Sequence, residues 1–118
     1  MHLHLRGKTV VVTGASSGLG RHFAEVAARA GAPRVCLAAR RIDKLQAAAA
    51  AVMDAGAQAL VVETDTRSRE SVQAMLDTVR SSWGAAPTTI INNAGVSRTA
   101  LALDATEDEY DVVMQTNL

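Results

Sequence analysis

The sequence has no excess of charge of either sign and no long hydrophobic run. Its 118 residues include 12 Lys and Arg and 12 Asp and Glu, so no long-range attraction draws the chain to phosphate backbones or acidic membranes. Nowhere do about 18 uncharged apolar residues follow one another, and the opening residues, MHLHLRGK, are too polar for a signal peptide. The composition therefore predicts a cytoplasmic protein with neither nucleic acid nor a membrane as its partner.

Side chains that form disulfides or bind metals are also scarce. The single cysteine, Cys36, cannot pair within the chain, and it lies in the apolar run VCLAA, which predicts a buried, unreactive thiol in a reducing compartment. His2 and His4 alternate with leucines at the start of the chain, but no Cys, Asp or Glu lies beside them. We predict no metal site.

Four short apolar runs are present instead. They lack the alternation of polar and apolar residues that marks a half-exposed sheet, so they predict strands that are buried on both faces. The runs are TVVVT (9–13), RVCLAA (34–39), ALVVE (59–63) and TTIIN (88–92).

Apolar stripes at helical spacing lie between these runs, and each ends at a glycine. The stripes are Leu19, Phe23, Val26, Ala27 and Ala30 before Gly31; Leu45, Ala48, Ala49, Val52 and Met53 before Gly56; and Val72, Met75, Leu76, Val79 and Trp83 before Gly84, with Ser68 as N-cap. A fourth helix is predicted over residues 106–118, which open with the capping-box pair Thr106 and Glu109.

Alternating strands and helices predict one α/β domain over residues 1–118, with a parallel sheet and right-handed crossovers. Ligands of such sheets bind beyond the carboxyl ends of the strands. The segment TGASSGLG (13–20) lies at such an end, between the first strand and the first helix.

The three glycines of this segment predict an anion site. Gly14 allows a tight turn, and a Cβ at Gly18 or Gly20 would block either a ligand or the neighbouring strand. The positive end of the helix that follows attracts a dinucleotide pyrophosphate, with hydroxyl and backbone donors from Thr13, Ser16 and Ser17 around it. A tight turn without a ligand is the alternative. A P-loop is excluded, because no G-K-[ST] follows the glycines.

Together, TGASSGLG (13–20) and NNAG (92–95) resemble the two hallmark motifs of the short-chain dehydrogenase/reductase family. The resemblance implies a Rossmann-type sheet with helices on both faces, strand order 3-2-1-4, and hydride transfer between NAD or NADP and an alcohol or ketone. It corresponds to the N-terminal half of the family's usual domain. The cofactor-binding role is carried over to Gly14, Ser16, Ser17, Gly18, Leu19 and Gly20.

The end of the second strand predicts which dinucleotide binds. An acidic residue there would accept hydrogen bonds from the ribose of NAD, but this position holds Ala39, followed by Arg40 and Arg41. Guanidinium groups suit a phosphate monoester, and a basic residue at Arg40 also resembles the NADP-preferring members of the family. We therefore predict NADP rather than NAD; the alternative is that both arginines are only solvated loop residues.

Five further positions are assigned by the resemblance. Asp65 would accept a hydrogen bond from the adenine amino group beside the backbone of Thr66, although Asp65 could also simply tighten its turn. The segment around Asn92, Ala94 and Gly95 would approach the cofactor riboses. For Asn92, a structural role in holding strand ends together is an equal alternative.

Asn117 lies at helical spacing from Tyr110 on an otherwise apolar face, where an amide needs partners. QTNL (115–118) resembles the family's asparagine-bearing segment, so Asn117 is predicted to belong to the Asn-Ser-Tyr-Lys catalytic set; a helix-end amide is the alternative. The serine and the Tyr-x-x-x-Lys of that set are absent from this sequence. We expect the chain to be truncated before that segment and to be inactive alone.

Two functions remain open from the sequence. The chain is either the cofactor-binding half of an NADP-dependent oxidoreductase acting on a small alcohol or carbonyl compound, or an inactive nucleotide-binding or interaction module. Strand order 3-2-1-4 would leave Thr89, Ile90 and Ile91 on an open edge, so we expect a homo-oligomer. Thr88 stands where relatives commonly carry aspartate, which predicts altered hydrogen bonding beside this strand.

Overall fold

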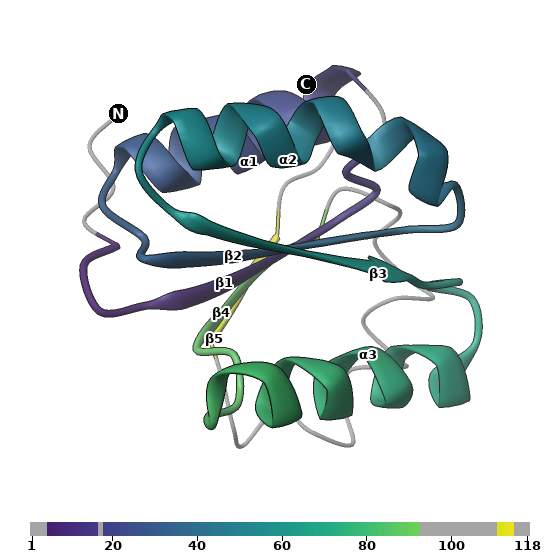
Figure 1. The fold of residues 1–118 in the computed structure, drawn as a ribbon. Coiled ribbons are helices and arrows are strands. Elements are labelled where there is room, and N and C mark those ends of the chain that lie inside the picture. The colour runs from purple at the N-terminus through teal and green to yellow at the C-terminus, as the bar shows by residue number, and fades with distance from the viewer. Residues whose placement is uncertain (1–4, 17, 93–110, 115–118) are drawn as a thin grey trace.

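The computed structural model describes residues 5–16, 18–92 and 111–114. Within them a parallel sheet has the order β3-β2-β1-β4-β5 (Figure 1). The strands are β1 (Thr9–Thr13), β2 (Arg34–Ala39), β3 (Gln58–Glu63), β4 (Thr89–Asn92) and β5 (Asp111–Met114). The first four strands confirm the predicted parallel α/β fold and the order 3-2-1-4.

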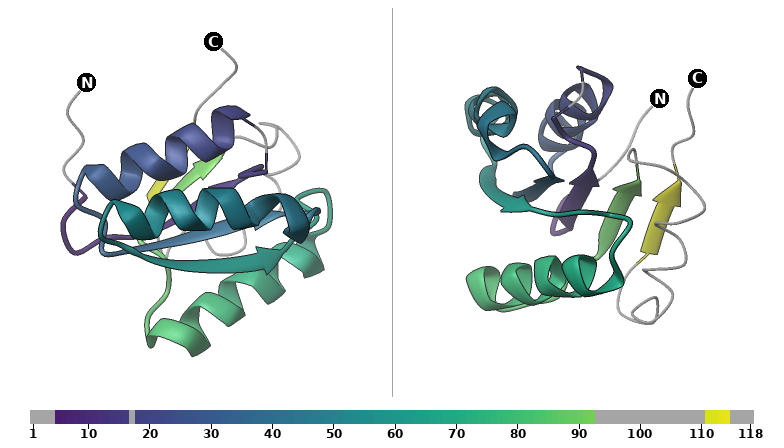
Figure 2. Two further views of the ribbon diagram at one scale, coloured as in Figure 1. Left: turned by 45° about the horizontal axis from the view of Figure 1, so that its top comes forward. Right: turned by 90° about the vertical axis from the view of Figure 1, so that its right-hand side faces the viewer.

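Helices cover both faces of the sheet, as predicted. Helices α1 (Gly18–Arg29) and α2 (Leu45–Asp54) lie on one face, α2 after the short 3-10 helix η1 (Ile42–Lys44), and helix α3 (Arg69–Trp83) lies on the other (Figure 2). The β-branched residues of β1 alternate between the two cores, since Val10 and Val12 pack toward α1 and α2 while Val11 packs toward α3. Strand β1 is therefore buried on both faces.

Helix α3 begins and ends at the cap residues that the sequence predicted, Ser68 and Gly84. The Ser68 side chain accepts a hydrogen bond from the Ser71 N–H, and the helix ends at Gly84, whose φ is 74°. A left-handed residue at this position favours glycine, so the predicted C-cap is confirmed. The residues of the predicted stripe that are buried are Val72, Met75, Leu76 and Val79.

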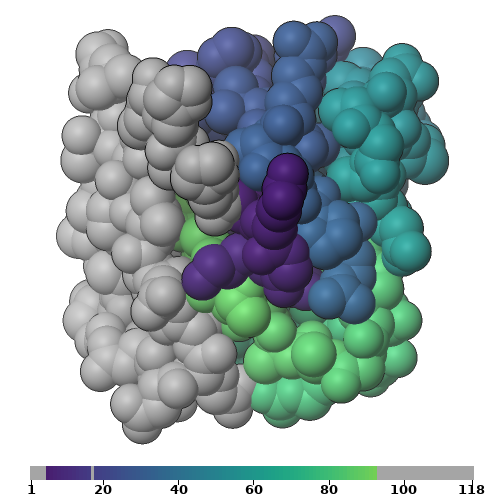
Figure 3. Space-filling view, turned by 90° about the vertical axis from the view of Figure 1, so that its left-hand side faces the viewer, coloured from purple at the N-terminus to yellow at the C-terminus, as the bar shows by residue number. Residues whose placement is uncertain are grey.

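The segment before β1 lies at the amino-terminal ends of the strands. The Leu5 N–H donates to the Ala30 carbonyl oxygen at 3.1 Å, which ties the chain start to the end of α1. Figure 3 looks onto this face, where the purple residues that precede β1 lie between the blue residues and the green ones. The carboxyl ends of the strands therefore lie on the opposite side of the molecule.

The predicted helix over residues 106–118 is wrong where the structure describes it. Residues 111–114 form β5, which pairs with β4 so that Ile90 faces Val112 and Ile91 faces Val113 in register. Pairing satisfies backbone groups that β4 would otherwise leave exposed, and adjacent valines favour a strand. The long-range pairing outweighs the local helical spacing, and the predicted open edge at Thr89, Ile90 and Ile91 is also wrong.

Strand β3 differs from its prediction in burial. Its inner residues are half-buried and both end residues, Gln58 and Glu63, are exposed, although the run was predicted to be covered on both faces. The cause is its place at the edge of the described sheet, where helices on either face cover it only in part.

Thr88, where relatives commonly carry aspartate, forms hydrogen bonds with the start of β1. Its Oγ1 accepts from the Thr9 N–H at 3.0 Å and its hydroxyl donates to the Thr9 carbonyl oxygen at 3.3 Å, while the Thr88 N–H donates to the same carbonyl at 2.9 Å. The hydroxyl thus joins the start of β1 to the residue before β4.

Replacing Thr88 with valine should destabilise the fold. Thr9 is only 2% exposed, so losing its acceptor leaves a buried N–H unpaired, at a cost of about 1–3 kcal/mol in the free energy of unfolding. Urea unfolding of the purified chain measures it. Thr78→Val is the control, because that hydroxyl bonds the Ala74 carbonyl on an exposed helix face and its loss should cost under about 0.5 kcal/mol. Equal losses in the free energy of unfolding for Thr88→Val and Thr78→Val would show that the Thr88 hydrogen bond to the Thr9 N–H does not stabilise the fold.

Candidate functional site

A tight turn follows β1 at the carboxyl edge of the sheet. Gly14 has a φ of 63°, a left-handed conformation that favours glycine. The next residue, Ala15, is fully buried, and its N–H donates to the Ala38 carbonyl oxygen of β2 at 3.3 Å. The turn is therefore anchored to the neighbouring strand before α1 begins.

Gly18 and Gly20, both in the first turn of α1, serve different purposes. A Cβ on Gly20 would meet the Gly14 carbonyl oxygen directly, and would lie 2.8 Å from the Gly14 carbonyl carbon and 2.9 Å from the Ala15 Cα. A Cβ on Gly18 would meet no atom within 4 Å. Gly20 is thus needed for packing of the helix against the turn, whereas packing does not explain Gly18.

Leu19 lies beside Gly18 and is 38% exposed, so it does not belong to the buried stripe of α1 as the spacing predicted. The helix turns its small residues, Gly20, Ala24 and Ala27, toward the sheet instead. An exposed leucine, a half-buried Ser16 and the positive end of the helix dipole therefore share this turn.

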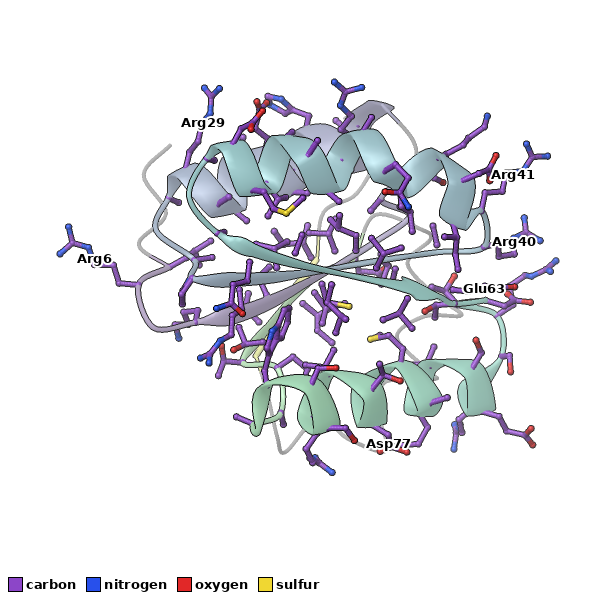
Figure 4. All side chains as sticks on the ribbon, in the orientation of Figure 1. Arg6, Arg29, Arg40, Arg41, Glu63 and Asp77 are labelled. Carbon is purple, nitrogen blue, oxygen red and sulfur yellow. The ribbon has the colours of Figure 1, made fainter. Side chains whose placement is uncertain are left out.

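The end of β2 presents two arginines beside this turn. Ala39 is 5% exposed, whereas Arg40 and Arg41 are exposed and lie at the same end of the molecule in Figure 4, opposite Arg6. Glu63 lies at this end as well, because it pairs in register with Ala39. Glu63 is not among the predicted site residues, because its place beside Ala39 depends on the register of two separate strands.

Asp65 follows β3 in a loop that its own neighbours hold in place. Its Oδ1 accepts from the Arg67 N–H at 3.0 Å and from Arg67 Nε at 3.1 Å, and its Oδ2 accepts from Arg67 Nη2 at 3.2 Å. The Asp65 N–H donates to Ser71 Oγ at 2.9 Å. The predicted turn-tightening role is confirmed, and Arg67 and Ser71 are additional residues of this loop that sequence reasoning missed.

Arg67 also sets the ionisation of Asp65. Its side-chain hydrogen bond, with its backbone N–H and the charge of Arg40 acting in the same direction, lowers the pKa of Asp65 below the ordinary value. The Asp65 carboxyl therefore stays ionised to a lower pH than an ordinary aspartate does.

The end of β4 is joined to the end of β1 by side chains. Thr13 Oγ1 donates toward Asn92 Oδ1 at 3.1 Å and lies 3.5 Å from the Ile91 carbonyl oxygen. Asn92 and Thr13 are opposite each other in register, and Asn92 has no exposed surface. This arrangement supports the structural alternative for Asn92, that it holds two strand ends together.

Of the other predicted site residues, the structure describes only Thr66. Thr66 is half-buried in the turn beside Asp65. Ser17, Ala94, Gly95 and Asn117 lie outside the described residues.

Cys36 is buried, as predicted, and burial raises its pKa to about 12. A thiol with this pKa is not a nucleophile at neutral pH. Within the described part of the chain, no cluster of three or more His, Cys, Asp or Glu side chains could hold a metal ion. Among these same residues, no helix has the length and apolar character needed to cross a bilayer.

A family model described as short chain dehydrogenase matches residues 8–118. This chain belongs to the short-chain dehydrogenase family. Among curated family members, it is 35% identical over 118 residues to the hydroxyacyl-CoA dehydrogenase ChsB1 of Mycobacterium tuberculosis, covering 97% of this chain and 37% of that protein. It is 32% identical to the 3-oxoacyl-[acyl-carrier-protein] reductase FabG of Vibrio harveyi, covering 98% and 46%. The chain thus spans less than half the length of these relatives.

Solved structures of the family share the fold. L-Sorbose reductase from Gluconobacter frateurii, complexed with NADPH and L-sorbose, has a TM-score of 0.70 and 40% identity over 81% of this chain and 36% of that one. NAD+-bound xylitol dehydrogenase has a TM-score of 0.82 over 95% of this chain and 54% of that one, at 23% identity, and supports the fold alone. The predicted membership and Rossmann-type fold are confirmed.

Replacing Gly20 with alanine should destabilise the chain strongly. The new Cβ would overlap the Gly14 carbonyl, and backbone must move to admit it, so we expect a loss of about 3 kcal/mol or more in the free energy of unfolding. Gly18→Ala is the matched control, since open space surrounds that position, and its effect should stay within about 1 kcal/mol. Thermal or urea unfolding compares them. A Gly20→Ala variant as stable as Gly18→Ala would show that the close approach is not needed.

Replacing Arg67 with glutamine should raise the pKa of Asp65 toward its ordinary value of about 3.9. The lowered pKa means that the ion pair contributes to stability above that pH and that the contribution is lost as the pH falls through the folded-state pKa. An NMR titration of the Asp65 carboxyl carbon measures the change. Arg29→Gln, which removes the exposed Arg29–Glu25 pair on α1, should leave the Asp65 pKa unchanged; a rise in both variants would point to net charge instead.

Proposed function

We propose that this chain forms the NADP-binding part of an oxidoreductase that transfers hydride between NADP(H) and a small alcohol or carbonyl compound. The observation that carries the cofactor assignment is the end of β2, where uncharged Ala39 is followed by exposed Arg40 and Arg41. In dinucleotide-binding sheets an arginine in this region accommodates the 2′-phosphate of NADP, whereas an acidic residue serves NAD.

The glycine-rich turn fits the pyrophosphate. Gly18 leaves open space beside the amino-terminal end of α1, where backbone N–H groups and the helix dipole favour an anion. Leu19 is exposed at the same turn and would be covered by a bound dinucleotide. Ser16 and, beyond the described residues, Ser17 would add donors around the phosphates.

Charge at this edge favours an additional phosphate. Asp65 would repel the 2′-phosphate if its charge were unopposed, but Arg67 binds both of its oxygens. Glu63, which pairs in register with Ala39, is a further carboxylate at the end of the molecule where Arg40 and Arg41 lie. The similar L-sorbose reductase is complexed with NADPH, which is the cofactor that this charge balance favours.

The remaining roles follow the family resemblance. Asp65 and Thr66 would contact the adenine, and Asn92, Ala94 and Gly95 would lie near the riboses. Asn117 would help to hold a water in the proton relay of the reaction. When bound, NADPH would supply the hydride, while this chain's own residues bind and orient it.

The assignment is tested by calorimetric titration of the chain with NADPH and NADH. We expect NADPH to bind about tenfold or more tightly, because a charge-assisted contact contributes roughly 1.5–3 kcal/mol. Arg40→Asp should reverse the order, and Arg6→Asp, the same change at the opposite end of the molecule, should not. Gly18→Ala should weaken both cofactors while keeping the stability of the chain.

Equal affinities for NADPH and NADH that Arg40→Asp leaves unchanged would contradict the choice of NADP. Binding of neither would contradict the cofactor function itself. Binding of NADPH by the complete protein without turnover of any alcohol or carbonyl compound would instead support the nucleotide-binding module.

A further inference from the structure

The Asp65 carboxylate is held more tightly than a surface aspartate usually is. Its side chain is 37% exposed and that of Arg67 58%, so both could rotate in solvent. Three hydrogen bonds from Arg67 hold the carboxylate instead. The Arg67 backbone N–H and Nε donate to Oδ1, and Nη2 donates to Oδ2. An arginine two positions after an aspartate in a turn can reach it in this way because the intervening backbone folds back.

The backbone beneath this pair is fixed as well. The Asp65 N–H donates to Ser71 Oγ at 2.9 Å, and the Asp65 carbonyl oxygen accepts from the Ser68 N–H at 3.0 Å. Ser68 in turn caps α3 by accepting from the Ser71 N–H at 3.1 Å. Asp65 is therefore tied to the first turn of a fifteen-residue helix on one side and to Arg67 on the other.

A carboxylate has about four acceptor sites on its two oxygens. Arg67 takes two of them on Oδ1 and one on Oδ2. One acceptor site thus remains on Oδ2 among the contacts of the described residues, with a direction that the guanidinium fixes.

We propose that Arg67 is a positioning residue that holds the Asp65 carboxylate so that Oδ2 accepts one hydrogen bond from the exocyclic amino group of the cofactor's adenine. This rests on the proposed function, in which Asp65 contacts the adenine. A fixed acceptor distinguishes adenine from hypoxanthine, whose oxygen at the same ring position offers no hydrogen and is repelled by the carboxylate. A rotating carboxylate can turn away from that oxygen and discriminates less.

The test compares the binding of NADPH with that of its hypoxanthine counterpart, reduced nicotinamide hypoxanthine dinucleotide phosphate, to four forms of the protein. They are the wild type, Arg67→Gln, Arg67→Lys and, as control, Arg29→Gln, which breaks an exposed ion pair of similar length on α1. The measured quantity is the dissociation constant of the hypoxanthine cofactor divided by that of NADPH, a ratio that a general loss of folding would not change, because it weakens the binding of both.

The wild type should prefer the adenine cofactor, and Arg67→Gln should lower the ratio about two- to tenfold, the usual effect of freeing one ordered side chain. Arg67→Lys should lower it too, because an ammonium group keeps the charge but lacks the planar fork. Arg29→Gln should keep the wild-type ratio. If Arg67→Gln does not fold, Arg67→Lys carries the same comparison.

A wild-type ratio retained in Arg67→Lys and in any folded Arg67→Gln would overturn this inference while leaving the proposed function intact. A wild-type ratio in Arg67→Lys together with a lowered ratio in Arg67→Gln would show that the positive charge at this position, not the orientation of the carboxylate, sets the preference for adenine. That result would also overturn this inference. Failure of the wild type to bind NADPH would overturn the proposed function, and this inference with it.

Discussion

The close approach of α1 to the turn after β1 is the contact on which the rest of this edge depends. Only a hydrogen at Gly20 fits against the Gly14 carbonyl and Ala15, so the helix can begin immediately beyond the strand. That placement brings the amino-terminal end of α1 to the carboxyl ends of the strands, where ligands of parallel sheets bind. It also leaves Gly18 and Leu19 exposed at this edge.

Side-chain hydrogen bonds align the strands that carry the site. Thr88 joins the start of β1 to the segment before β4, and Thr13 joins the carboxyl end of β1 to Asn92 at the end of β4. The two links lie at opposite ends of the same strand pair, so sliding of β4 along β1 would break both. Buried hydroxyl and amide groups thereby add to the apolar packing that sets the register of β4 against β1.

The loop after β3 is a short polar segment held by its own hydrogen bonds. The side chains of Asp65 and Arg67 are 37% and 58% exposed, yet the carboxylate accepts from three donors and its backbone is tied to α3. Exposed ion pairs usually add little stability. The effect of this pair is to orient the Asp65 carboxylate and to lower its pKa.

By itself the sequence determined the features that depend on nearby residues: four strands, three helices, the caps at Ser68 and Gly84, and the glycine turn, because each follows from backbone preference or a period of a few residues. Only the tertiary structure decided that residues 111–114 pair with β4, that Leu19 is exposed, and that Glu63 lies beside Ala39 at the end of β2. These outcomes depend on which groups meet across the fold. A strand edge that needs a partner, or a carboxylate beside the end of a neighbouring strand, exists only once the sheet has aligned its strands.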